Sequence, residues 1–329
     1  MSQTHWTGSS GRALAVEVVD RLKRGRSLDD LHLGSSNHRQ DLRGLPASPS
    51  PASAPQQVGR LTVQAAKGIV EITGRFLSGI DLSEAQLNGW RLNKTQIADC
   101  KFDRARCIEW VLWGSAVRDS SFDRADLRGA ILGTFPEGGR IVWENVTFIG
   151  ADLRDASAYG AVFRSCDFSR ARFENTSFNQ CDFTRCRFAG RVEEAVFDGR
   201  TIPGHASSHE MEAVDFTDAS FVNVEFRGYS LAGALMPSNP DVFVIQRFPC
   251  VARKVLQKLE GDESLPGRVV RGVLANSLRS PVERADEAWV FNRRDWREWG
   301  GNETVTLAET AMKQAETECL QASTTAELR

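Results

Sequence analysis

Large apolar residues recur at every fifth position through the middle of the chain. The series runs from Leu77 to Leu132, resumes from Trp143 to Phe188, and returns from Phe216 to Met236. Neither the 3.6-residue period of a helix nor the two-residue period of a strand gives this spacing. A short fixed period held over so many residues predicts a solenoid built from repeated units.

The residue two positions before each large one is usually small. Ala125 precedes Leu127 in this way, and Cys166 precedes Phe168. Positions that are two apart in an extended segment point to the same side. Each five-residue word is therefore expected to bury one large residue, its centre, and one small residue, and then to turn a corner. The other three residues, often Asp, Arg, Asn, Gly or Ser, are expected to face water.

The clearest words identify the type of repeat. They are ADLRG at 125–129, ADLRD at 151–155, CDFSR at 166–170 and CDFTR at 181–185. This region resembles the pentapeptide-repeat protein family, whose word is a small residue, Asp or Asn, Leu or Phe, and two polar residues. The resemblance implies a mainly β fold, a right-handed quadrilateral β-helix with four words per coil and about seven coils. Residues twenty apart would then stack, as in the column Phe148, Phe168 and Phe188.

The N-terminal residues do not follow the five-residue period. Apolar residues at helical spacing predict a helix over residues 12–24, with Gly25 as its C-terminal cap. The Pro- and Ser-rich residues 45–57 are typical of a linker. Short strands leading into the array are expected at residues 61–63 and 69–72. The sequence DLRG at 41–44 repeats that at 126–129, which is a weak indication of a degenerate repeat.

The period is lost again after Pro237. Two amphipathic helices are predicted at residues 251–260 and 268–278, either to cap the coil end or to join two copies as a homodimer. The Thr-, Ala- and Glu-rich tail from Asn302 is expected to be at most a loose, frayed helix. The predicted organisation is an N-terminal helix and linker at 1–58, the repeat array at 59–236, a helical cap or dimerisation region at 237–300 and a flexible tail at 301–329.

Composition narrows the class of protein. The chain has 329 residues and a formal net charge of −2, which does not suggest a general nucleic-acid or membrane binder. No stretch approaches the ~20 apolar residues of a membrane span, and no signal peptide is evident, so a cytoplasmic location is expected. The seven cysteines are odd in number and form no CxxC pair, which argues against a disulfide framework or a zinc site. Cys166 and Cys186 would stack, and are expected to be small core residues.

No catalytic motif is present. The chain lacks the Walker, Rossmann, GxSxG and HExxH patterns, and a filled coil interior leaves no room for a pocket. We therefore expect a protein that is not an enzyme and holds no cofactor and no metal. His205 and His209 with Glu210 and Glu212 are too few for a convincing metal site, so a solvated loop is the favoured interpretation.

Two kinds of feature are candidates for partner binding. The series is interrupted at 134–140 and 199–212, and such insertions project from a solenoid. The candidate loop residues are Phe135, Glu137, Arg140, His205, His209 and Glu210. The candidate aromatic residues are Trp90, Trp110, Trp289, Trp296 and Trp299. Trp90 and Trp110 fall at small inward positions, so either the coil bulges to hold them, which is favoured, or they turn outward as an exposed pair.

The resemblance also suggests a function. Quinolone-resistance members of the family carry two projecting loops and engage DNA gyrase and topoisomerase IV with a rod that mimics duplex DNA. This implies a non-enzymatic, macromolecule-binding rod that modulates or protects such an enzyme, with no direct contact to nucleic acid. The rod here is only mildly acidic, which weakens DNA mimicry. The alternative is a general protein-interaction scaffold whose terminal regions select the partner; an enzymatic C-terminal region is less favoured.

Overall fold

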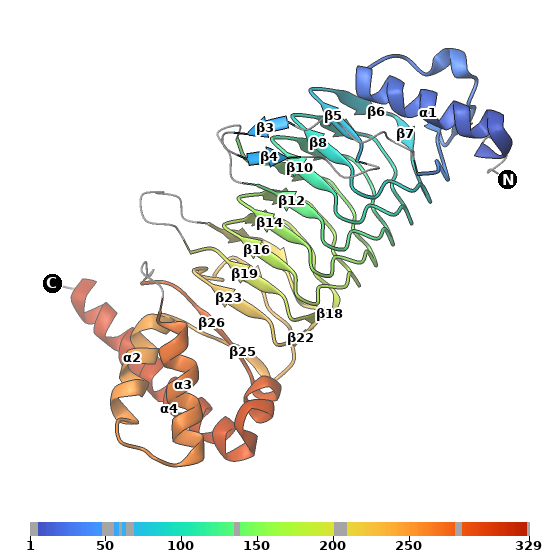
Figure 1. Ribbon diagram of the computed structural model, residues 1–329. Helices are drawn as coiled ribbons and strands as arrows, with labels where there is room; N and C mark the ends of the chain where they lie inside the picture. Colours follow the sequence, from blue (N-terminus) through green and yellow to red (C-terminus); the bar gives the residue numbers. More distant parts are fainter. Residues whose placement is uncertain are drawn as a thin grey trace. The chain divides into compact units, whose positions relative to one another are not determined.

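The chain forms two compact units, Met1–Thr176 and Ser177–Arg329. The computed structural model describes residues 6–47, 56–58, 61–63, 69–134, 139–200, 209–279 and 285–327. For 56–58, 61–63 and 323–327 it describes the backbone alone. Most of the first unit and the first part of the second consist of short parallel strands (Figure 1).

In the first unit, parallel strands stack in columns (Figure 1). One column contains β5 (Glu71–Thr73), β8 (Arg91–Asn93), β10 (Val111–Trp113), β12 (Ile131–Gly133) and β14 (Ser157–Tyr159). A second contains β6 (Phe76–Ser78), β9 (Gln96–Ala98), β11 (Ala116–Arg118), β13 (Val142–Glu144) and β15 (Val162–Arg164). Single bridges, such as Asp81 to Lys101 and Gln86 to Arg106, form two further columns. Four columns per turn confirm the predicted repeat solenoid, with one word on each side of the coil.

Each corner of the coil is turned by the residue two positions after a word's centre. Arg104 and Arg124 hold this place with φ of 58° and 59°, and Gly129 holds it with φ of 65°. This left-handed conformation is unfavourable for most L-residues but open to glycine, which explains why Gly recurs at this position. The corner therefore sets the length of the word, because the chain must turn onto the next side of the coil before it can bury the next pair of inward residues.

Aromatic rings stack through the interior of the first unit. Phe148 and Phe168 lie with ring centroids 4.8 Å apart and planes 2° from parallel, and Phe102 and Phe122 lie 4.6 Å apart. All four side chains are fully buried. Stacked pairs of this kind add to the free energy gained from burial. Phe148 and Phe168, two members of the column predicted from twenty-residue spacing, are thus in direct ring contact.

The small inward positions also connect successive coils. Thr95 donates its hydroxyl hydrogen to the carbonyl oxygen of Ile72 (3.0 Å), and Ser115 donates to that of Leu92 (2.9 Å). Each bond therefore reaches back 23 residues, to the coil before. Small polar residues are consequently tolerated inside the coil, because their hydroxyl groups are satisfied by backbone.

The first interruption leaves the register of the coils intact. Val117 pairs with Trp143 across 26 residues, whereas it pairs with Ile97 across 20. The interruption therefore adds six residues to one side of one coil, and the next word resumes in line. Trp143 donates its indole hydrogen to the carbonyl oxygen of Leu132 (2.9 Å), which closes the coil beneath the insertion.

The helix predicted at 12–24 is confirmed as α1 (Gly8–Arg24), which ends at Gly25 in the left-handed conformation. Arg75 donates to the carbonyl oxygen of Lys23 (2.9 Å) and so ties the helix to the start of the array. A 3₁₀ turn, η2 (Asp29–Leu31), follows.

The degenerate repeat suggested at 41–44 is also confirmed. β2 (Arg39–Asp41) pairs antiparallel with β1 (Ser35–Ser36) and parallel with β7 (Ile80–Asp81), so that Asp41 lies beside Asp81. Leu42 is fully buried, as a word centre should be. The strand predicted at 61–63 is β4 (Leu61–Val63), which forms an antiparallel hairpin with β3 (Gln56–Val58).

The repeat pattern continues into the second unit. β16 (Ser177–Asn179), β19 (Val196–Asp198) and β23 (Glu225–Arg227) form one column. The other parallel pairs are β17 (Asp182–Thr184) with β20 (Met211–Glu212), β18 (Gly190–Glu193) with β22 (Ala219–Val222), and β21 (Val214–Asp215) with β24 (Ala234–Leu235). Val192 and Phe197 are word centres that the sequence pattern missed, because the step from Phe188 to Val192 is four residues.

The C-terminal region is a helical layer beside an antiparallel strand pair. The strands are β25 (Val242–Ile245) and β26 (Trp289–Asn292), and the helices are α2 (Phe248–Lys258), α3 (Leu265–Ser277) and α4 (Arg293–Glu327), which is broken at Gly301. The two predicted helices are confirmed as α2 and α3, with their first residues three earlier in each case. Figure 1 shows the three helices side by side.

The tail from Asn302 is not a loose helix, as expected, but an ordered part of α4. Its buried apolar residues are Val305, Ala308, Met312, Ala315 and Cys319, which recur at alternating steps of three and four. This spacing gives a continuous apolar stripe that packs against α2 and α3. The polar composition of the tail concealed the stripe.

The expectation of no disulfide is wrong for one pair. Cys250 of α2 and Cys319 of α4 are bonded, with their Cα atoms 6.2 Å apart. The other five cysteines form no disulfide and are buried, and they include Cys166 and Cys186, which are core residues as predicted. An odd number of cysteines does not exclude a single disulfide between two helices that lie far apart in the sequence.

The C-terminal region closes the last coil of the second unit. Asn292 donates its amide hydrogen to the carbonyl oxygen of Phe221 (3.0 Å), and the backbone N–H of Gly228 donates to the carboxylate of Glu287 (2.8 Å). These bonds satisfy backbone groups that a further coil would otherwise pair. Of the two roles expected for this region, the contacts are those of a cap.

Replacing Phe168 with Ala is expected to lower the free energy of unfolding by about 3–5 kcal/mol, because it opens a cavity in the ring column. Phe76→Ala is the matched control. Phe76 is 68 % exposed, so its loss is expected to cost under about 0.5 kcal/mol. Urea denaturation of the full chain measures both. Equal losses for the two variants would contradict the described column.

Reduction of the Cys250–Cys319 bond is expected to lower the melting temperature of the cap, since a link across 69 residues restricts the unfolded chain. The expected loss is about 2–4 kcal/mol. Calorimetry with and without dithiothreitol measures it. The double variant Cys250→Ala/Cys319→Ala serves as control and should not respond to the reductant; the wild-type protein failing to respond would argue against the bond.

Candidate functional site

The candidate loop residues fall into two groups. Phe135, Glu137 and His205 lie outside the described residues. Arg140 donates from its guanidinium to the carbonyl oxygens of Gly160 (2.7 Å) and Ala161 (3.0 Å). Arg140 thus anchors the end of the first insertion to the coil.

At the end of the second insertion, His209 is buried. Its ring nitrogen Nδ1 lies 3.1 Å from a carboxylate oxygen of Asp182, and the backbone N–H of Glu210 donates to the same carboxylate (3.3 Å). These contacts fasten the loop to β17. Among the described residues, no group of three or more His, Cys, Asp or Glu side chains is placed to hold a metal ion.

Trp90 and Trp110 do not form an exposed pair. They are 2 % and 1 % exposed and stack inside the coil, with centroids 6.2 Å apart and planes 10° from parallel. Trp110 donates its indole hydrogen to the carbonyl oxygen of Leu87 (2.6 Å). The neighbouring centre is Cys107 where most words have Leu or Phe, which leaves volume for the ring. The interior alternative is therefore the one formed, and these two residues offer no surface to a partner.

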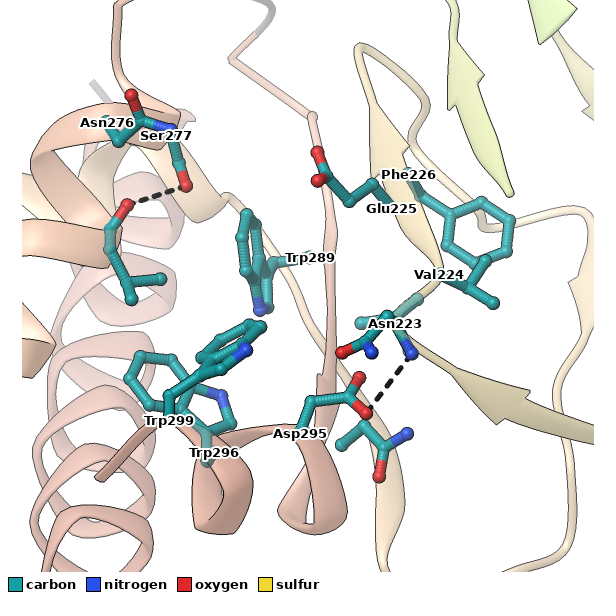
Figure 2. Close-up of a pocket in the computed structure, with 13 residues that line it drawn as sticks. Asn223, Val224, Glu225, Phe226, Asn276, Ser277, Trp289, Asp295, Trp296 and Trp299 are labelled. Carbon is teal, nitrogen blue, oxygen red and sulfur yellow. Dashed lines mark hydrogen bonds between the residues drawn. The ribbon is translucent and has the colours of Figure 1, made fainter. Parts of the chain in front are cut away.

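Trp289, Trp296 and Trp299, in contrast, come together around a pocket in the second unit (Figure 2). The pocket has a volume of about 330 Å³. Its walls come from β23 and the turn before it, the end of α3, β26 and the first turns of α4. β26 runs directly into α4, which is why one short aromatic segment supplies two of the walls.

The aromatic walls are held by packing from behind. Trp289 stacks on Phe248 with centroids 4.6 Å apart, and Trp296 stacks on Phe291 at 5.5 Å. Trp299 meets Trp296 edge to face at 5.3 Å and remains 43 % exposed. Trp296 is thus a buried wall of the pocket that its neighbours hold in place, while Trp299 forms the exposed rim that a partner can reach.

A buried carboxyl group lies at the bottom of the pocket. Asp295 is 5 % exposed and accepts the backbone N–H of Asn223 at 3.2 Å (Figure 2). Burial raises the pKa of Asp295 to about 6, and the nearby negative charge of Glu298 also raises it, while Arg294 opposes the shift. A carboxyl group in this position is ready to take up a positive charge or a hydrogen-bond donor.

The indole nitrogen of Trp289 is a second unusual group. It is buried and has no hydrogen-bond acceptor among the residues that the structure describes. An unsatisfied buried donor costs about 1–3 kcal/mol, so tryptophan nitrogens in interiors usually find an acceptor. The pocket therefore offers a free donor close to a carboxyl group.

The charge of the pocket is one-sided. Its lining contains two acidic residues, Asp295 and Glu225, and no Arg, Lys or His. A larger hollow on the first unit differs, because both acidic and basic side chains line it and some pair with one another, as Arg43 does with Asp81 and Arg104 with Glu84. The aromatic pocket is therefore the more specific site.

Sequence reasoning found the three tryptophans but not the polar groups. Asn223 and Glu225 sit in two successive, ordinary-looking repeat words, and only the fold brings them to the aromatic segment. Asp295 was detectable as the acidic residue between two arginines and Trp296. Within the described part of the chain, no helix is long and apolar enough to cross a membrane.

Asp295→Asn is expected to stabilise the protein at pH 8. The folded state raises the pKa of Asp295, so it favours the protonated form, and this favourable contribution is lost as pH rises through about 6. The amide removes the charge, which should add roughly 1–3 kcal/mol at pH 8 and little at pH 4. Thermal unfolding at both pH values measures the effect. Glu303→Gln, an exposed change on α4, is the control, and a destabilised Asp295→Asn at pH 8 would refute the expectation.

Comparisons with known proteins agree with the repeat architecture. Residues 147–185 match the family model for pentapeptide repeats. Among solved structures, the chain is similar to Rfr23 of the cyanobacterium Cyanothece 51142, with 14% identity, 39% of this chain and 91% of that chain covered and a TM-score of 0.30. It is similar to HetL of Nostoc sp. strain PCC 7120, with 20% identity, 65% and 97% covered and a TM-score of 0.22.

It is also similar to trypsin-treated QnrB1, a plasmid-mediated fluoroquinolone resistance protein, with 22% identity, 51% and 80% covered and a TM-score of 0.26. No curated protein matches the sequence at a significant level. The matched words and the four columns of strands lead to the same conclusion: this part of the chain consists of pentapeptide repeats.

Proposed function

We propose that this protein is a non-enzymatic scaffold that binds other proteins and selects its partner through the C-terminal region. The observation that supports this best is the pocket beneath Trp299. An exposed indole beside a buried, one-sidedly charged hollow is typical of a contact that dominates the binding energy of an interface.

The repeat surface supports the same proposal, because charged side chains there pair with one another. In the word at 125–129, Arg128 forms two parallel hydrogen bonds with Asp126, each 2.8 Å long, and Arg154 pairs with Asp152 in the same way. Such exposed pairs are worth little individually and occupy the charges that would otherwise meet a partner. The selective chemistry is therefore concentrated at the cap.

Modulation of DNA gyrase or topoisomerase IV is the second candidate. It is favoured by the two insertions, because pairing that spans 20 residues elsewhere spans 26 at the first insertion and 28 at the second, where Phe183 pairs with Met211. The fluoroquinolone resistance named for QnrB1 makes this the partner to test first. The mild acidity of the repeats remains an argument against DNA mimicry.

The scaffold is tested by affinity capture with the full chain in three forms: wild type, Trp299→Ala and Trp113→Ala. Trp113 is 50 % exposed on the first unit and serves as the matched control. The expected result is a partner that is captured by wild type and Trp113→Ala and is lost with Trp299→Ala. Capture of the same proteins by all three forms would overturn selection by the cap.

Gyrase is tested separately, by supercoiling and quinolone-induced cleavage with added protein. No change at saturating protein would remove this candidate. Two further proposals accompany the main one: action in the cytoplasm, and a homodimer formed through the C-terminal helices. Analytical ultracentrifugation tests the dimer, and fractionation of source cells tests the location.

A further inference from the structure

The aromatic pocket has one tryptophan face ready for a ligand. Phe248 covers one face of Trp289 at 4.6 Å, and the other side of the ring borders the pocket (Figure 2). Trp299 adds a partly exposed ring at the rim. Tryptophan is the aromatic side chain that attracts cations most strongly over its face, and the attraction grows when water is excluded.

The buried carboxyl group indicates the sign of the charge that a ligand of this pocket carries. Asp295 has one hydrogen bond among the described residues, from the backbone of Asn223. Its other oxygen is directed into the pocket (Figure 2). A buried carboxylate is costly unless a cation or several donors satisfy it, and the lining contains no basic side chain to do so. A ligand that brings a positive charge would complete this group.

The indole hydrogen of Trp289 indicates a second feature of the ligand. This donor is buried and unsatisfied within the described part of the protein. Figure 2 shows the edge of the ring that carries the nitrogen on the side of Trp299 and Asp295. An ammonium ion alone offers no acceptor for it. A basic residue in a peptide offers both a cation and a backbone carbonyl oxygen.

The size of the pocket agrees with a single residue. Its volume of about 330 Å³ lies at the lower end of the range for ligand sites. That is room for one long side chain and its adjoining amide groups. The exposed rim at Trp299 lets the rest of a chain continue outside.

We propose that the pocket binds a lysine or arginine side chain of a partner protein, with the cation between Trp289, Trp299 and the carboxylate of Asp295. The carbonyl oxygen next to this residue accepts the indole hydrogen of Trp289. Glu225 also lines the pocket, and its carboxylate pairs with Arg227. This inference rests on the proposed scaffold function and gives the partner's chemistry.

The test uses the eight indole N–H signals of the full-length protein labelled with ¹⁵N-tryptophan. The probes are N-acetyl-lysine methylamide, its arginine equivalent, and N-acetyl-norleucine methylamide, which has the same shape without the charge. The signals of Trp289 and Trp299 are expected to shift and to saturate with the basic probes, and norleucine should bind at least tenfold more weakly. The signal of Trp113 should not move.

Two variants separate charge from folding. Asp295→Asn keeps the acceptor for Asn223 and is expected to weaken the lysine probe at least fivefold, while norleucine binding stays the same. Glu303→Gln, an acidic change on α4 outside the pocket, should bind both probes as wild type does. Circular dichroism establishes that both variants are folded.

The pH profile adds a check that a merely structural carboxyl group would not pass. The charged groups that act on Asp295 are Glu298 and Arg294 on α4 itself, and Glu225 from β23 lines the same pocket. Binding of the lysine probe is expected to fall between pH 7.5 and pH 5, because Asp295 becomes protonated, and binding of norleucine should not change.

Several results would overturn the inference. Equal binding of lysine and norleucine probes would show that charge is irrelevant. Shifts caused by glucose but not by lysine would identify a saccharide site. Equal binding of tetramethylammonium would remove the role of the carbonyl oxygen. Failure of the basic probes while Trp299-dependent capture persists would refute the inference alone, whereas binding of the probes without any captured partner would refute the scaffold function.

Discussion

The structure depends on one constraint: the backbone of each coil is satisfied by the coils before and after it. Strands of three residues are too short to be stable alone, and they persist because each lies in register with its neighbours twenty residues away. That register holds only if every word buries a large and a small side chain at the same height. The five-residue pattern, the stacked rings and the left-handed corners all follow from it.

The same constraint explains what the sequence predicted well. A fixed period identifies the repeat wherever the word is regular, and it even indicated the isolated word at 41–44. The five-residue period did not identify words of a different length that still keep the register. The word centred on Val192 is one residue short, which breaks the five-residue spacing. Val192 nevertheless pairs with Phe221, so the column is preserved. Trp90 and Trp110 broke the rule of small inward residues, yet both rings are buried in the interior, where they stack on one another.

Outside the array, predictions needed contacts that no local pattern contains. The apolar stripe of α4 was hidden by polar neighbours, and the bond between Cys250 and Cys319 joins helices that are distant in sequence. The three tryptophans could be found by composition, whereas Asn223 reaches Asp295 only because the last coil and the cap pack together. Polar groups are left incompletely satisfied at this junction, since a repeating surface there meets one that does not repeat. Specific chemistry arises where the periodicity ends.

The corners have a consequence for how such a protein can change. The turn of the coil from Val117 to Trp143 has six extra residues, and the turn from Phe183 to Met211 is longer still, yet the strands paired across each turn remain aligned. The entropy cost of a longer loop grows only slowly with its length, and the coil bears none of the resulting strain. In a pentapeptide coil the alignment of successive coils is therefore fixed, whereas the number of residues at a corner can vary. New segments can be inserted at single corners without a change in the packing of the core.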